Sequence, residues 1–243
     1  MLKLLLLFVF CINIIHFSVY AKEQGEQVKI PAFKAYYNIL RQSDVVGTAI
    51  RELKYLENGL AKYSYRTELE WLIFSDERQE TSLINIDRAK VTPLKYEFIR
   101  TGTGKDKHYK WQFDIKKNHA FNTIKHEDHI IDFPENIQDK LSYHFQHRLN
   151  MIKNSSQEHY VYPVIGTSGK IKNYVYQYNG TEDIMLPYGL VKTIKLKREV
   201  IEKKRVTYAW FAPELDYLLV KLYQSKAGTE QFQAQLKSIE KEK

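Results

Sequence analysis

Apolar and polar residues alternate with a period of two along most of this chain. Phe33, Ala35, Tyr37 and Ile39 share one parity, and polar residues such as Lys34 lie between them. This alternation predicts a strand with one buried face. The same pattern predicts further strands at 45–56, 60–71, 80–85, 95–100, 109–115, 120–125, 160–165, 171–178, 191–201, 206–211, 218–224 and 231–236.

Turn residues separate the predicted strands. Asn58–Gly59 and Asn179–Gly180 predict tight hairpin turns, because both residue types tolerate positive φ. Gly102–Lys105 also predicts a hairpin turn. It does not match a phosphate-binding loop, which needs four residues between its glycines and a Ser or Thr after the lysine.

One segment, 136–152, has the period of a helix. Its apolar residues are Ile137, Leu141, Phe145, Leu149 and Ile152. Spacings of three and four place these side chains on one face of an α-helix that packs on the sheet. Residues 132–135 ahead of it resemble a capping box, with Pro134 inside the first turn.

Short strands that recur about every ten residues, with one helix among them, indicate the fold class. The prediction is a mainly β protein, built as a single large curled antiparallel sheet or as a barrel, with one amphipathic helix. No linker or internal repeat divides the pattern. We expect a single β-rich domain over residues 31–243, preceded by a polar leader over residues 22–30.

Residues 1–21 predict export. Lys3 is followed by a run of Leu, Phe, Val and Ile, and Val19–Tyr20–Ala21 provides acceptable residues at the −3 and −1 positions of a cleavage site. A positive start, an apolar run and such an end are typical of a secretory signal peptide. We expect cleavage between Ala21 and Lys22 and a periplasmic mature protein.

Two other interpretations of this segment are less favoured. A membrane anchor needs about 20 uninterrupted apolar residues, and Asn13 and His16 interrupt this run. A lipid attached to Cys11 would require a small residue before the cysteine, but Phe10 occupies that position.

Composition narrows the classes of function. Cys11 is the only cysteine, so a chain cleaved after Ala21 has no disulfide, cysteine-ligated metal or thiol nucleophile. The net charge of +8 comes from lysines scattered through the strand pattern, as on solvated faces. The 18 tyrosines suit half-buried sheet surfaces. Export argues against nucleic acid as a partner, despite basic and aromatic residues at Tyr109–Lys110–Trp111.

Motifs for catalysis or metal binding are weak. Histidines occur in close pairs at His126 and His129, and at His144 and His147. No HExxH motif or third ligand accompanies them, so the expectation is surface or stripe-edge histidines without a metal. No G-x-S-x-G motif occurs, and Glu214 and Asp216 are acids in a turn that begins with proline. We therefore expect no catalytic residue, no metal and no cofactor.

Two motifs carry a family resemblance. At QDKLSY (138–143) and WFAPELDY (210–217), the chain resembles the exported bacterial domain-of-unknown-function family 3108 (DUF 3108). Supporting matches are at 33–37, 102–107 and 193–196. The chain departs from the family pattern at Leu219, where proline is expected, and at Leu186, where threonine is expected.

The resemblance implies a periplasmic protein of a Gram-negative bacterium, and no established activity can be transferred from the family. It also implies that the two motifs are the most constrained parts of the architecture. The candidate contact residues are Gln138, Asp139, Tyr143, Trp210, Asp216 and Tyr217. Packing and binding are both open roles for them, and packing is favoured because Tyr143 and Trp210 are core-type residues.

Three functions fit these observations. The leading hypothesis is a non-enzymatic protein of the cell envelope that binds or carries a lipid or another amphipathic molecule in an aromatic-lined cavity, with peripheral membrane contact. The second is an envelope assembly or interaction protein that uses an exposed sheet edge or a basic face and has no ligand cavity. The third is a hydrolase whose site the sequence does not reveal.

Overall fold

The computed structural model describes residues 30–71 and 73–241, so the predicted signal peptide, its cleavage site and most of the polar leader lie outside the described residues. The described residues form one 14-stranded sheet in the order β8-β7-β6-β5-β4-β3-β2-β1-β14-β13-β12-β11-β10-β9. The strands are β1 (Phe33–Arg41), β2 (Asp44–Tyr55), β3 (Ala61–Trp71), β4 (Phe74–Asp87), β5 (Lys90–Gly102), β6 (Lys107–Asp114), β7 (His119–Asn122), β8 (Glu127–Ile130), β9 (His159–Ile165), β10 (Ile171–Leu186), β11 (Gly189–Val200), β12 (Arg205–Ala212), β13 (Leu218–Lys226) and β14 (Thr229–Lys241). The helix α1 spans Ser142–Lys153, and three 3₁₀ turns are η1 (Ile115–Lys117), η2 (Ile201–Lys203) and η3 (Pro213–Leu215).

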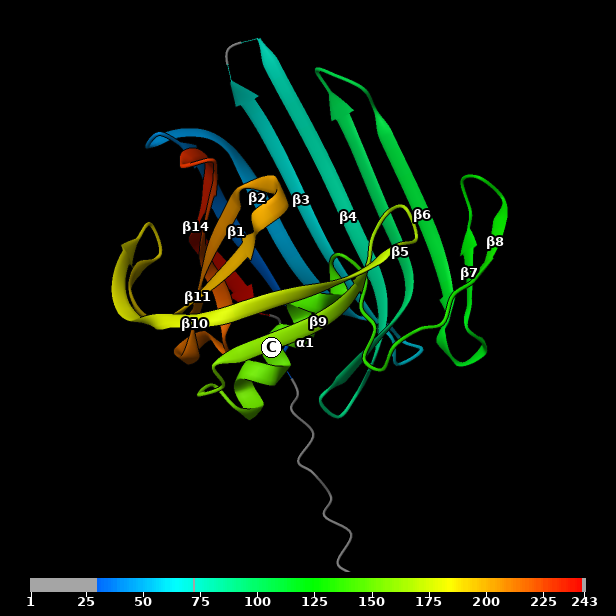
Figure 1. The fold of residues 1–243 in the computed structure, drawn as a ribbon. Coiled ribbons are helices and arrows are strands. Elements are labelled where there is room, and N and C mark those ends of the chain that lie inside the picture. Colours follow the sequence, from blue (N-terminus) through cyan, green and yellow to red (C-terminus); the bar gives the residue numbers. More distant parts are fainter. Residues whose placement is uncertain (1–29, 72, 242–243) are drawn as a thin grey trace, which may run out of the picture.

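The sheet curls around its own core but does not close. Every pair of neighbouring strands is antiparallel, and β8 and β9 are the two edges. The first and last strands, β1 and β14, pair with each other in the middle of the sheet. Figure 1 shows α1 beside β9 at one end, while the β3–β4 hairpin extends furthest at the other end. The predicted fold class, a curled antiparallel sheet with one helix, is confirmed in its open form.

Loops, not paired strands, join the two sides of the curl at the helix end. The backbone N–H of Gln138 donates to the Pro163 carbonyl at 2.9 Å, and the N–H of Ile165 donates to the Gln138 carbonyl at 2.9 Å. Nε1 of Trp111 on β6 donates to the Thr167 carbonyl in the β9–β10 loop at 3.2 Å. These contacts hold the two sides together there.

The helix packs on the sheet with its predicted apolar face. Ile137, Leu141, Phe145 and Leu149 are all buried, and α1 contacts β5 and β9. Burial also extends around the helix to His147, which has only 2% of its surface exposed. The expectation of a surface or stripe-edge histidine at 147 was therefore wrong.

The predicted start of the helix was also wrong, because α1 begins at Ser142 and not near 136. Gln138 is instead in a bridge with β9, and Asn136 has a φ of 58°. The capping box lies at Asp139 and Ser142, not at 132–135. Asp139 Oδ1 accepts the N–H of Ser142 at 2.7 Å, and Ser142 Oγ accepts the N–H of Asp139 at 2.9 Å.

Predicted turns were correct at two of the three sites. Asn58–Gly59 lies between β2 and β3, and Gly102–Lys105 lies between β5 and β6. Asn179–Gly180, however, lies inside the 16-residue strand β10. There the pairing with β11 shifts register between Tyr178 and Thr181, and Gly180 has a φ of 99°. Glycine at this position accommodates a bulge in a continuous strand, so the expected hairpin turn was wrong.

Candidate functional site

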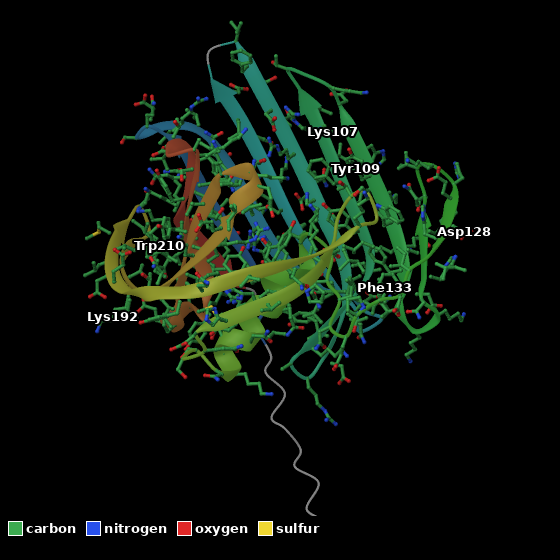
Figure 2. The ribbon with its side chains drawn as sticks, viewed as in Figure 1. Lys107, Tyr109, Asp128, Phe133, Lys192 and Trp210 are labelled. Atoms are coloured by element: carbon green, nitrogen blue, oxygen red, sulfur yellow. The ribbon has the colours of Figure 1, made fainter. Side chains whose placement is uncertain are left out.

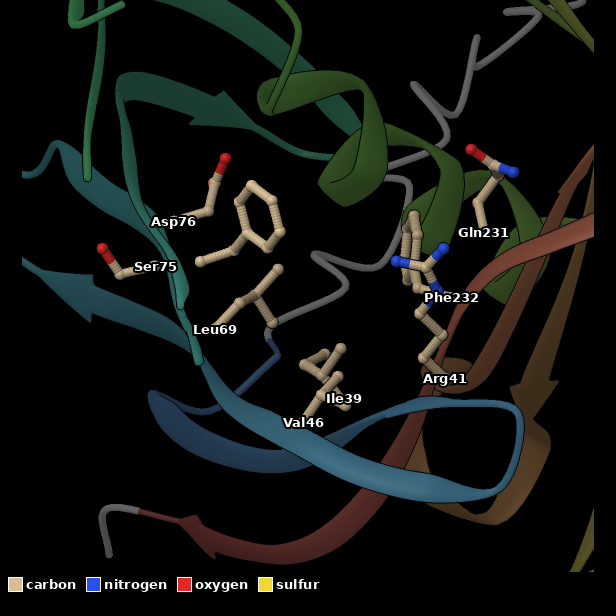
Figure 3. Close-up of a pocket in the computed structure, with 9 residues that line it drawn as sticks. Ile39, Arg41, Val46, Leu69, Ser75, Asp76, Gln231 and Phe232 are labelled. Carbon is tan, nitrogen blue, oxygen red and sulfur yellow. The ribbon is translucent and has the colours of Figure 1, made fainter. Parts of the chain in front are cut away.

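Two neighbouring cavities lie against the β1–β4 part of the sheet. Cavity 1, of about 330 Å³, is lined by Ile39, Arg41, Val46, Leu69, Phe74, Ser75, Asp76, Gln231 and Phe232. Figure 3 shows Ile39, Val46 and Leu69 pointing into a space that Phe232 faces from the other side. Val46 points there because the β1–β2 pairing shifts register between Ile39 and Leu40 and leaves it unpaired. Cavity 1 is therefore predominantly apolar.

Cavity 2, of about 150 Å³, has a more polar lining than cavity 1 and lies beside the start of α1. It is lined by Tyr37, Arg51, Tyr65, Glu80, Lys140, Leu141, His144, Leu219, Leu222, Phe232 and Ala234. Phe232 lines both cavities. The lining of cavity 2 thus combines ionisable side chains from the sheet and the α1 region with almost as many apolar ones.

The two cavities follow each other along the strands. On β1 the lining passes from Ile39 to Tyr37, on β3 from Leu69 to Tyr65, and on β4 from Asp76 to Glu80. Each step covers two or four residues, and residues two apart on a strand share a face and are separated by about 7 Å. Because three strands shift in the same direction and Phe232 lines both cavities, the cavities are neighbours along the strands, and together they are called the groove below. Its more polar part, cavity 2, is lined by residues at the start of α1, and its apolar part, cavity 1, is lined by Phe74 at the β3–β4 hairpin. Figure 1 shows α1 and this hairpin at opposite ends of the sheet.

Strand register sets the polar part of the groove. Arg51 on β2 pairs with Tyr65 on β3, and Tyr65 pairs with Glu80 on β4. Three ionisable side chains therefore form one row on the inner face of the sheet. Arg51 lies between the apolar residues Ala49 and Leu53 on its face of β2, whereas Glu80 lies between the polar residues Arg78 and Ser82 on its face of β4.

Arg51 is a buried cation held between tyrosines. Its Nη1 donates to the Tyr63 hydroxyl at 3.3 Å, and its guanidinium carbon lies 5.8 Å and 5.2 Å from the ring centres of Tyr63 and Tyr65. Burial alone would lower the pKa of Arg51, but the hydroxyls of Tyr63, Tyr37 and Tyr65 outweigh it and raise this pKa. Arg51 therefore stays charged in the folded protein.

Glu80 and His144, which also line cavity 2, are shifted toward their neutral forms. Burial raises the pKa of Glu80, although Lys140 and a hydrogen bond from the Tyr96 hydroxyl at 3.2 Å act against this rise. Burial also holds the pKa of His144 well below its usual value, and the positive charge of Arg51 adds to this effect. The polar end of the groove therefore has more positive than negative charge.

An ion-pair cluster lies at the apolar end of the groove. Asp76 accepts from Arg78 Nε at 2.6 Å and from Arg100 Nη2 at 2.6 Å. Burial raises the pKa of Asp76, but the two arginines outweigh burial and hold this pKa below its usual value. One carboxylate thus faces two guanidiniums, so this cluster keeps a net positive charge.

Gln138 and Asp139, from the first sequence motif, are fully buried and fasten the start of α1. Gln138 Nε2 donates to the Val91 carbonyl on β5 at 2.8 Å. Asp139 accepts from the Ser82 hydroxyl on β4 in addition to the backbone of α1. Burial raises the pKa of Asp139 to about 6. Both side chains bind parts of the protein itself.

Tyr143, Asp216 and Tyr217 lie around the helix. The hydroxyls of Tyr143 and Tyr176 are hydrogen-bonded at 3.2 Å. Arg148 of α1 donates from Nε to the carbonyl of Asp216 at 2.6 Å and lies 3.8 Å from its carboxylate. The N–H of Tyr217 donates to a carbonyl at the end of β12 at 2.8 Å. Arg148 thereby joins the helix to the second sequence motif.

Trp210 lies on the β10–β11 side of the molecule, away from β6 (Figure 2). Its Nε1 donates to Glu182 at 2.7 Å, and its ring lies 5.0 Å from Lys195 Nζ and 4.8 Å from Lys221 Nζ. None of the six residues predicted as contacts lines either cavity. Their role in contacting a ligand or partner stays a prediction.

Sequence reasoning missed the residues that line the groove. A usable signal was present, since Arg51 has the parity of Ala49 and Leu53 in an alternating strand. A charged residue on the buried face of an alternating strand indicates a candidate functional site, because buried arginines are rare. Its neighbours on other strands could not be found in this way, because strand register is not visible in the alternation.

Within residues 30–71 and 73–241, no group of three or more His, Cys, Asp or Glu side chains is arranged to hold a metal ion. In the same residues, no helix has the length and apolar content needed to cross a bilayer.

Comparison with known proteins relates the chain to a family and to solved folds. The family model "Protein of unknown function (DUF3108)" matches residues 60–236, and no curated protein matches the chain in sequence. A β-barrel-like protein of the domain of unknown function DUF1849 from Brucella abortus has a TM-score of 0.61 at 9% identity, covering 88% of this chain and 99% of that chain. This similarity concerns the fold alone.

Two further structures are less similar. A DUF1089 family protein from Pseudomonas aeruginosa has a TM-score of 0.38 at 12% identity, covering 74% of this chain and 91% of that chain. A Bacteroides fragilis protein, described as exported and as having a YmcC-like fold, has a TM-score of 0.34 at 12% identity, covering 88% and 97%. Neither similarity is high enough to support an argument.

Proposed function

The chain belongs to the DUF3108 family of proteins of unknown function, and because membership assigns no activity, we propose from the groove that it binds an amphipathic molecule of the cell envelope. The supporting observation is that cavity 1 is predominantly apolar, while the neighbouring cavity 2 has several ionisable side chains in its lining. Cavity 1 suits a hydrocarbon chain, and cavity 2 suits a polar head group. Ligand sites commonly combine an apolar lining with a few placed polar groups.

The proposal assigns binding or carriage to the protein and no catalysis. Amphipathic molecules in the envelope need protection of their chains when they leave a membrane, and burial of apolar surface supplies the binding free energy. The signal-like segment at residues 1–21 supports a place in the periplasm. The exposed apolar residues Ile73 and Phe74, at the β3–β4 hairpin by cavity 1, would allow the groove to approach a membrane surface.

Nile red, an uncharged dye that fluoresces in apolar surroundings, tests this function. It should bind the wild-type protein saturably. Val46→Trp places a large ring in cavity 1 and should weaken binding by about tenfold or more, which corresponds to about 1.4 kcal/mol. The matched control is Val45→Trp at the adjacent position. Val45 lines neither cavity, and 60% of its surface is exposed.

Both variants introduce the same residue into the same strand, so a difference between them reports the groove. Circular dichroism should show that both are folded. Equal binding by wild-type protein and Val46→Trp would place the dye outside cavity 1 and contradict the proposal. Absence of saturable binding by the wild-type protein would contradict it as well.

A further inference from the structure

Arg51 is a buried cation of the groove without an anionic partner in the described part of the chain. Only 6% of its surface is exposed. No carboxylate of residues 30–71 and 73–241 lies within 4.0 Å of its guanidinium, and its Nε–H has no hydrogen-bond partner among them. Buried arginines are normally paired with a carboxylate or phosphate, because an unpaired buried charge is unfavourable. Among the described residues, Arg51 therefore lacks the anion that normally accompanies a buried guanidinium.

The ionisable groups around Arg51 have an excess of positive charge. Glu80, Lys140 and His144 line the same cavity. His144 is held neutral by burial, and the carboxyl of Glu80 accepts its hydrogen bond from Tyr96, not from Arg51. The two cations of the cavity, Arg51 and Lys140, therefore outnumber its one carboxyl, that of Glu80. A bound anion would balance this excess.

We propose that the groove binds a single-chain carboxylate of the fatty-acid class, with its head group on Arg51 and its chain in cavity 1. This inference rests on the proposed function and adds the class of ligand to it. A carboxylate accepts charge-assisted hydrogen bonds from a guanidinium, and Arg51 lines cavity 2. A volume of about 150 Å³ for cavity 2 suits this small head group. A phosphate head group is larger and is less suited to this volume.

The position of the cavities determines the orientation of the bound molecule. Cavity 2 lies at the inner end, where Lys140, Leu141 and His144 of the α1 region cover it. Cavity 1 lies toward the β3–β4 hairpin, where 53% of the Phe74 surface is exposed. The carboxylate therefore enters first, and the chain follows along the apolar residues to the open end. A volume of about 330 Å³ for cavity 1 is at the lower limit for ligand pockets, which favours one chain over two.

Competition against Nile red with molecules of equal chain length tests the head group. Dodecanoate, methyl dodecanoate and dodecyl phosphate are compared on the intact protein, below their aggregation concentrations. Dodecanoate should bind at least about tenfold more tightly than the other two. Arg51→Met should remove the preference over the ester and leave ester binding unchanged. The control Arg66→Met removes an exposed arginine of β3 and should keep the preference.

A second measurement does not depend on the Met variant being folded. Dodecanoate labelled with ¹³C at its carboxyl carbon should titrate at lower pH when bound than when free, because Arg51 stabilises its charged form. Arg51→Lys keeps the positive charge and should retain part of this shift. A bound carboxyl that titrates as the free one does would contradict the assignment.

The outcomes separate this inference from the proposed function. If ester and carboxylate bind equally while Val46→Trp weakens both, the groove binds amphiphiles but the inference is wrong. Tighter binding of dodecyl phosphate would overturn the carboxylate class. A carboxylate preference that survives Arg51→Met in a folded protein would place the anion elsewhere and also overturn it. If none of the molecules displaces Nile red and the dye itself does not bind, both proposals fail.

Discussion

Asp139 shows how a single buried carboxyl can make folding depend on pH. Burial raises its pKa from 3.8 to about 6, although hydrogen bonds from Ser142, Ser82 and Leu141 act in the opposite direction. Because the folded-state pKa is the higher one, the folded state binds more protons between these two values. The favourable contribution of the protonated form is complete below about pH 4 and is lost as the pH rises through 6.

Asp139→Asn removes this titration and preserves the shape of the side chain. The free energy of unfolding of the wild-type protein, relative to this variant, should fall by about 3 kcal/mol between pH 4 and pH 7, from about 2 pKa units at 1.36 kcal/mol each. Urea unfolding at several pH values measures the difference. The comparison also cancels the opposite effect of His147, whose pKa burial lowers to about 3. A difference that does not change with pH would contradict the prediction.

At the scale of elements, α1 depends on burial more than on its own helix propensity. Leu149 is completely buried, and the helix is only 12 residues long. Isolated helices of this length are marginal in water, so packing must supply most of the stability. Leu149→Ala should therefore lower the free energy of unfolding by about 2–5 kcal/mol.

Lys153→Ala is the matched control, because Lys153 is an exposed residue of the last turn. It should change the free energy of unfolding by less than about 0.5 kcal/mol. Chemical denaturation of the two variants and the wild-type protein provides the comparison. If Leu149→Ala were as stable as Lys153→Ala, α1 would contribute little to the fold and would act as a mobile cover.

The same elements show what could be predicted from the sequence. The apolar face of α1 was predicted from spacing, because each of its side chains repeats one local relation to the helix axis. Its start was not, since Gln138 is held by a bridge to β9 that lies far along the chain. The error at Asn179–Gly180 has the same cause: pairing of β10 with β11 on both sides of the bulge keeps the strand continuous. At both places, pairing with another strand overrode the structure that the local sequence pattern favours.

At the scale of the whole molecule, alternation predicted a curled antiparallel sheet but not its order. Neighbouring strands along the chain pair as hairpins, which the short turns already indicate. The pairing of β1 with β14 joins residues about 200 positions apart and leaves no local trace. The groove depends on this pairing, since Ile39 and Phe232 line cavity 1 from these two strands. Its residues were for that reason missed, while many tyrosines expected in a cavity pack around α1.

The position of a strand in the sheet should determine its local stability. β1 lies between β2 and β14, and Ala35, Tyr37 and Ile39 are buried on it. β8 is a four-residue edge strand that pairs only with β7, and 91% of the surface of Ile130 is exposed. Few apolar contacts and one set of ladder hydrogen bonds allow β8 to open without global unfolding.

Hydrogen–deuterium exchange measures this difference directly. Amides of β8 should exchange at least about a hundredfold faster than those of β1, which are expected to exchange only by opening that approaches global unfolding. The β9 edge provides an internal comparison, because Gln138 and the Trp111–Thr167 contact hold it to the opposite side of the curl. Protection of β9 should therefore exceed that of β8, although both are edge strands. Equal exchange at the two edges would mean that these contacts do not hold the curl together in solution.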